Sequence, residues 1–92
     1  MYLEIISPEA TLFTGEVESL SLPGTNGSFQ VLENHAPIVS TLQAGNVKIR
    51  GTIRLSKQVQ SQFETVSKDE TLFPITSGTV EMRDNKIILL SD

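Results

Sequence analysis

The sequence predicts an all-β fold, a two-sheet antiparallel β-sandwich of about nine or ten short strands. Short runs that alternate apolar and polar residues recur along all 92 residues. Residues that favour turns separate these runs at regular spacing, as they do in sandwich proteins. No linker, low-complexity tract or internal repeat interrupts the pattern. At this length we expect one domain, covering residues 1–92.

The first two strands are expected near the amino terminus. Tyr2–Ile6 is the first strand and is ended by Ser7-Pro8. The next candidate, Glu16–Leu22, changes the parity of its apolar positions once. That slip predicts a β-bulge near Ser19.

Two turn signals follow. After them come a strand and then a turn that contains the only histidine of the chain. Pro23-Gly24 suits the two central positions of a type II turn, because proline presets φ and glycine supplies a positive φ. Asn26-Gly27 is the commonest two-residue hairpin signal. Phe29 and Val31 then alternate with polar residues, so one face of their strand should be buried. The chain turns again at 35–37.

The middle of the chain leaves alternatives open. Ile38–Leu42 is a strand, and Asn46–Leu55 is either one long amphipathic strand or two strands bent at Gly51. In residues 56–71, the apolar positions 59, 63 and 66 fit a helical stripe. The segment Gln58–Val66 equally fits one arm of a β-hairpin. We favour the extended hairpin, because every neighbouring segment is a strand.

The last third predicts three further strands. Thr71–Thr76 contains Pro74, which confines that point to a sheet edge or a bulge. Thr79–Arg83 alternates on its apolar residues. Asp84-Asn85 then forms a tight turn into Lys86–Leu90.

Composition narrows the possible functions. Seven basic and eleven acidic residues give a net charge of −4 without a basic patch, which argues against nucleic-acid binding. The chain has no cysteine, so a disulfide framework and a thiolate metal site are excluded. The longest apolar run, Ile87–Leu90, is far too short for direct membrane insertion. The amino terminus lacks the pattern of a signal peptide, so we expect a cytoplasmic protein.

Catalytic chemistry is not indicated. His35 is the only histidine, and Glu33 is its nearest acidic neighbour in sequence. No nucleophile-elbow motif occurs, and a zinc site would need carboxylates for its other ligands. A turn histidine that bonds to backbone or faces a partner fits the sequence better. The loop Gly24–Ser28 lacks the ending of a phosphate-binding loop, so we expect a turn and a hairpin there and no cofactor.

Five segments of this chain, in order and near the family's spacing, resemble the N-terminal β-sandwich domain of the epsilon subunit of bacterial F-type ATP synthases. They are Leu3–Glu9, Leu12–Val17, Leu22–Leu32, His35–Ile49 and Ser77–Asp92.

The resemblance implies a non-catalytic subunit of the central rotor stalk. Such a domain clamps the foot of the gamma subunit and rests on the ring of c subunits, joining the two for proton-driven ATP synthesis. It lies peripherally at the cytoplasmic face of the inner membrane. The family's gamma-facing positions fall on Ser7, His35 and Ser40. Its ring-facing positions fall on Asn26, Gly27 and Ser28.

Four departures from the family pattern stand out. Glu33-Asn34 replaces a common proline-glycine, and Thr79 replaces the second glycine of a usual S-G-G. The segment Ser56–Thr71 is longer than the usual connection. Family members usually continue into a helical hairpin that can inhibit ATP hydrolysis and in some species binds ATP. The sequence ends at Asp92, so we expect the hairpin and the nucleotide site to be absent from these residues.

The alternative function is a free-standing β-sandwich module that binds peptides or carbohydrates. Carbohydrate sites usually expose aromatic side chains, whereas this chain has one tyrosine, four phenylalanines and no tryptophan.

Overall fold

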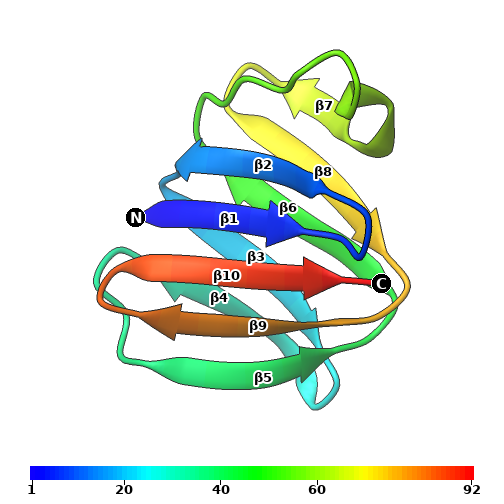
Figure 1. The fold of residues 1–92 in the computed structure, drawn as a ribbon. Coiled ribbons are helices and arrows are strands. Elements are labelled where there is room, and N and C mark those ends of the chain that lie inside the picture. Colours follow the sequence, from blue (N-terminus) through cyan, green and yellow to red (C-terminus); the bar gives the residue numbers. More distant parts are fainter.

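The computed structural model describes residues 1–92 and shows a sandwich of two curved sheets (Figure 1). The front sheet has the strand order β2-β1-β10-β9-β5, and the back sheet has the order β4-β3-β6-β8-β7. The sheets join where Gly24 of β3 pairs with Leu42 of β5. The predicted fold class is confirmed. The elements are β1 (Tyr2–Ile6), β2 (Thr11–Glu16), β3 (Ser19–Gly24), β4 (Gly27–Leu32), β5 (Ile38–Leu42), β6 (Gly45–Arg50), η1 (Gln60–Gln62), β7 (Glu64–Ser67), β8 (Glu70–Ile75), β9 (Gly78–Arg83) and β10 (Lys86–Ser91).

One strand pair adds a feature that the sequence did not indicate. β1 and β10 are parallel, in register from Tyr2 opposite Lys86 to Ile6 opposite Leu90. All other pairs are antiparallel. The two ends of the chain therefore share the centre of the front sheet (Figure 1).

The core lies between the sheets and consists of the apolar residues that alternate along the strands. Leu3, Ile5, Ile87 and Leu89 are completely buried at the centre of the front sheet. Each such side chain contributes about 1.5–3 kcal/mol by leaving water. The other buried apolar residues come from both sheets and from the segment before β7: Met1, Leu12, Phe13, Val17, Leu20, Leu22, Val31, Leu42, Val47, Ile49, Val59, Phe63, Phe73, Ile75, Val80 and Met82.

The predicted strand Glu16–Leu22 is wrong, because the chain changes sheets within it. β2 ends at Glu16 in the front sheet, and β3 begins at Ser19 in the back sheet. At the crossing, the Val17 N–H donates to the carbonyl of Met1, and the Glu18 N–H donates to the carbonyl of Arg50. The change in apolar parity that predicted a bulge marks this crossing.

The type II turn predicted at Pro23-Gly24 is also wrong. Both residues lie in β3, opposite Ser28 and Gly27. Proline is accepted there because β6 pairs with β3 only as far as Ser21, so no ladder partner needs an N–H from Pro23. The predicted hairpin is present, but its two turn residues are Thr25 and Asn26.

The middle segment differs most from expectation. β6 ends at Arg50, and the positive φ of 136° at Gly51 turns the chain out of the sheet, so neither form of the expected strand through Leu55 occurs. The favoured hairpin over Gln58–Val66 is wrong as well. A 3-10 helix stands at 60–62, and the hairpin lies farther along, between β7 and β8.

The last third follows the prediction closely. Pro74 lies in β8 opposite Asn46 of β6. On the other side of β8, β7 pairs only as far as Leu72, so β8 is an edge strand at Pro74. Asp84 and Asn85 both have positive φ, 53° and 60°, as the tight turn between β9 and β10 requires.

Candidate interaction surfaces

The turn between β3 and β4 is tied firmly to the end of β5. The Thr25 N–H donates to the carbonyl of Thr41, and the Gln43 N–H donates to the carbonyl of Pro23. The hydroxyls of Thr25 and Thr41 also lie 2.8 Å apart and form a hydrogen bond. Three hydrogen bonds therefore connect the two sheets at this end of the sandwich.

The predicted ring-facing residues form the tip of that hairpin. Asn26 is in the turn, and Gly27 and Ser28 begin β4. All three are exposed, and Gly27 has a φ of 120°, which favours glycine. The tip projects from the lower end of the molecule in Figure 1. The structure thus brings these three predicted residues together on one protrusion.

A polar network holds the loop before His35. The ammonium of Met1 donates to a Glu33 carboxylate oxygen at 2.7 Å, and the other oxygen accepts from the Asn85 amide at 2.8 Å. The side-chain Oδ1 of Asn85 in turn accepts from the backbone N–H of Asn34, also at 2.8 Å. The loop is therefore connected both to the start of β1 and to the β9–β10 turn.

These contacts change the protonation of the two charged groups. The hydrogen bond to Glu33 raises the pKa of the Met1 ammonium above its ordinary value of 8.0, and it outweighs burial, which lowers that pKa. That ammonium, followed by the Asn85 amide, holds the pKa of Glu33 below its ordinary value of 4.5. Both groups therefore stay charged over a wider pH range than they would alone.

Glu33 and Asn34 also explain how the loop manages without the family's proline-glycine. Asn34 has a φ of 58°, a left-handed conformation that asparagine tolerates better than most residues. His35 follows, with its N–H bonded to the carbonyl of Leu32 and its Nδ1 donating to the carbonyl of Ala36 at 2.7 Å. The expectation of a turn histidine bonded to backbone is confirmed.

The three predicted gamma-facing residues do not form one cluster. Ser7 closes the β1–β2 turn through hydrogen bonds of its backbone and hydroxyl with Ala10. It follows the carboxyl end of β1, whereas His35 precedes the amino end of β5. Ser40 lies within β5 on the inward parity, half-buried, and its hydroxyl bonds to the carbonyl of Thr41. The three residues therefore lie at two opposite ends of the front sheet and on its outermost strand, β5.

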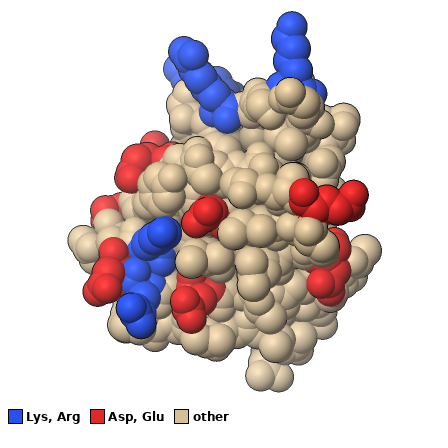
Figure 2. Space-filling view, in the orientation of Figure 1, with Lys and Arg blue, Asp and Glu red and all other residues tan.

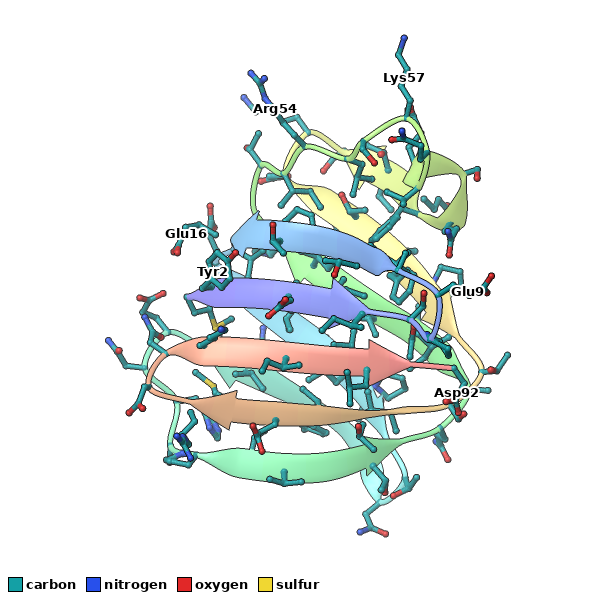
Figure 3. All side chains as sticks on the ribbon, viewed as in Figure 1. Tyr2, Glu9, Glu16, Arg54, Lys57 and Asp92 are labelled. Carbon is teal, nitrogen blue, oxygen red and sulfur yellow. The ribbon has the colours of Figure 1, made fainter.

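Charge is unevenly distributed over the surface. Figure 2 shows basic side chains at the top of the molecule, above β2, and Figure 3 identifies Arg54 and Lys57 there. Acidic residues are spread over the front sheet. The opposite end is uncharged in Figure 2, because neither Thr25–Ser28 nor β5 contains a charged residue.

The largest hollow, about 620 Å³, opens at the end of the sandwich where Glu9 and Asp92 lie (Figure 3). Histidine and acidic side chains do not gather in groups of three or more that could hold a metal ion. The structure contains no helix long and apolar enough to cross a membrane.

Sequence reasoning missed the residues that hold the β3–β4 turn and the loop before His35 in place. The Thr25–Thr41 contact joins residues far apart in the chain, and the partners of Glu33 come from the two ends of the sequence. A weak signal for the contacts of Glu33 was the pair Glu33-Asn34 itself, which stands where the family usually has proline-glycine.

Comparison with known proteins gives consistent results. The sequence profile of the ATP synthase delta/epsilon chain β-sandwich domain matches residues 1–92. The ATP synthase epsilon chain of Leptospira interrogans is 38% identical over 98% of this chain and 59% of its own length. That of Chlorobaculum tepidum is 34% identical over 98% of this chain and 86% of its own. The chain thus spans about three fifths of the Leptospira relative.

A structural comparison supports the fold. A chain in the structure of the central stalk and c-ring of the Tetrahymena thermophila mitochondrial ATP synthase matches with a TM-score of 0.74. The match covers 99% of this chain and 62% of the other, at 18% identity.

Proposed function

Because the chain belongs to the family of ATP synthase delta/epsilon chain β-sandwich domains, we propose that residues 1–92 form one domain of a central-stalk subunit. In this role the domain joins the gamma subunit to the ring of c subunits and performs no catalysis itself. It works peripherally, at the cytoplasmic face of the inner membrane. The observation that carries the proposal is the match of the family profile over the full 92 residues.

The connection between the two proposed contact regions supports this role. The exposed tip Asn26–Ser28 is the proposed ring contact, and β5 belongs to the proposed gamma contact. Three hydrogen bonds through Thr25, Thr41 and Gln43 join these regions directly. Packed, hydrogen-bonded strands deform little under load, so force applied at the tip passes to β5 with little loss.

The proposed gamma contact spans the border of the front sheet. His35 and Ser7 lie at opposite ends of this sheet, and the hydrogen bonds of both side chains are made within their own turns. We propose that these turns contact gamma mainly through their shape. Ser40 is half-buried at an inward-facing position of β5.

Binding to recombinant gamma tests the proposal. Ser40→Arg should weaken the complex at least tenfold, because a large charged side chain at β5 obstructs the contact. Ser61→Arg is the matched control, since Ser61 is exposed in the 3-10 helix outside the proposed contact. If the folded domain does not bind gamma, the rotor proposal is wrong, and the free-standing binding module becomes the leading candidate.

The ring contact is tested separately with purified c-ring in detergent. Asn26→Asp and Ser28→Asp should alter binding to the ring and leave binding to gamma unchanged. Equal effects of these variants on both partners would contradict the division into two surfaces.

A further inference from the structure

Asn26 is the one asparagine of the chain that is followed by glycine. Asn26 and Gly27 are both exposed at the tip of the β3–β4 hairpin (Figure 1). The position at which a side chain of Gly27 would begin has no atom of another residue within 4 Å. Because glycine has no Cβ, its backbone nitrogen can be approached closely. The side-chain amide of Asn26 therefore meets no steric barrier on the side of Gly27.

The two sides of the hairpin tip are held differently. Thr25, on the β3 side, is bonded to Thr41 of β5 through its backbone N–H and its hydroxyl. Gly27, on the β4 side, pairs with Gly24 at the last position of the β3–β4 ladder. The last pair of a ladder opens at a much lower free-energy cost than the core strands do. The backbone nitrogen of Gly27 is therefore accessible for reaction without unfolding of the domain.

The other three asparagines are protected, each for a different reason. The residue after Asn34 is His35, whose backbone N–H is already bonded to a carbonyl. The amide of Asn85 is held at both ends by the loop before the histidine. Asn46 lies within β6 and is followed by Val47, which is completely buried. The chain thus contains its own comparison set for the reactivity of Asn26.

We propose that Asn26 is a site of spontaneous deamidation in the folded domain. The backbone nitrogen of Gly27 loses its proton and attacks the Cγ of Asn26. The new N–Cγ bond closes a cyclic imide as the Cγ–Nδ2 bond breaks, and the amide nitrogen leaves as ammonia. Water then opens the imide at either of its two carbonyl carbons. The products are aspartate and isoaspartate, in which the main chain runs through Cγ. Water is the one co-reactant.

Either product changes the chemistry of the hairpin tip. The tip carries no charged residue, and deamidation places one carboxylate there, on a chain whose net charge is already −4. Isoaspartate also lengthens the main chain within a tight turn, which disturbs the pairing of Gly24 with Gly27. The reaction itself is independent of the proposed function. Its effect on the ring contact rests on that function, because the tip is the proposed contact.

Ageing of the purified wild-type domain at neutral pH tests the proposal directly. Peptide mapping by mass spectrometry follows the replacement of each amide NH2 by OH, and an isoaspartyl methyltransferase with labelled S-adenosylmethionine counts the isoaspartate formed. Asn26 should convert at least about tenfold faster than any of the other three asparagines, because it alone precedes a glycine. Conversion of Asn26 at the same rate as the others would overturn the inference.

A destabilised variant shows whether the reaction occurs in the folded domain. Phe63→Ala removes a buried ring far from the tip in sequence and should raise the unfolded fraction on the order of a hundredfold. If Asn26 reacts in the folded domain, its rate in Phe63→Ala should stay within about twofold of wild type, because only the end of the hairpin has to open. A rate that rises in proportion to the unfolded fraction would overturn the inference.

Asn26→Gln separates the reaction from its effect on the ring. Glutamine would have to close a larger imide, so this variant should gain no negative charge at the tip on ageing, as isoelectric focusing measures. Aged wild type should bind purified c-ring at least about fivefold more weakly than fresh wild type, because the contact would bury an unpaired carboxylate. Aged Asn26→Gln should keep the affinity of its own fresh preparation. If fresh wild type does not bind the ring, the ring contact in the proposed function fails, whereas the ageing measurement still decides the inference.

Discussion

Two segments outside the strand ladder are held to the sandwich in different ways. The loop from Glu33 to Pro37 is fixed by polar contacts to the Met1 ammonium and to Asn85. The segment from Thr52 to Gln62, with Phe63 at its end, is fixed by apolar side chains. Val59 and Phe63 are buried, and the Phe63 ring stacks on Phe73 with centroids 4.7 Å apart.

The difference shows that a segment without ladder hydrogen bonds can be positioned by either kind of contact, with different consequences. Apolar anchoring depends on shape and area and varies little with pH or salt. Polar anchoring depends on charge and is strong only while both partners are ionised. Four substitutions separate the two cases, from the largest expected effect to the smallest.

Removal of the Phe63 ring should have the largest effect. Phe63→Ala leaves a cavity beside Phe73 and should lower the free energy of unfolding by about 3 kcal/mol. Chemical denaturation measures this loss. Val66→Ala is the matched control, because Val66 is 52% exposed on β7 and should change stability little. Similar losses for both variants would mean that the buried ring does not anchor the segment.

Val59 supplies the second apolar anchor and should matter less. Val59→Ala removes two buried methyl groups, worth about 1.5 kcal/mol by area. Proteolysis under native conditions should cut first between 52 and 62 in this variant, because the segment has no strand partner to hold it. Cleavage that begins in the 33–37 loop instead would contradict this order of local stability.

The sequence predicted most of what is local. The bounds predicted for β1, β5, β9 and β10 match the structure within a residue or two. The pair Asp84-Asn85 specified its turn because both residues tolerate positive φ. The Asn26-Gly27 signal likewise predicted the hairpin, although its turn residues are Thr25 and Asn26.

The failures have one physical cause, which is that long-range contacts decide between local options. The crossing at Val17-Glu18 is fixed by bonds to Met1 and Arg50, far away in sequence. Pro23-Gly24 remains in a strand because its neighbour β6 stops short. Val59 and Phe63 do share a buried face, as a helical stripe predicts, but the chain forms only one 3-10 turn there before β7 begins.

The polar loop also depends on the backbone conformation of Asn34. Asn34→Ala should lower stability by about 1 kcal/mol, because alanine at a φ of 58° carries a larger steric cost than asparagine. Asn34→Gly should restore or slightly raise stability, since glycine adopts this conformation freely. Thermal unfolding of the two variants gives the comparison. Equal effects of alanine and glycine would show that the Asn34 side chain, not its φ, matters.

The smallest effect should come from the charge of Glu33, and its signature is pH dependence. Because its pKa is lowered, Glu33 adds to the free energy of unfolding. This contribution is present above pH 4.5 and is lost as pH falls through the lowered pKa. Because its pKa is raised, the Met1 ammonium also adds to the free energy of unfolding. This contribution is present below pH 8.0 and is lost as pH rises through the raised pKa.

The stability difference between wild type and Glu33→Gln should therefore be greatest between about pH 4.5 and 8 and shrink on both sides. Added salt should reduce this difference within that window, because the Glu33 carboxylate is exposed to solvent. Phe63→Ala is the control, and its difference from wild type should stay constant over the same range. A Glu33→Gln difference that does not vary with pH would mean that shape alone holds the loop, which would remove the distinction between the two segments.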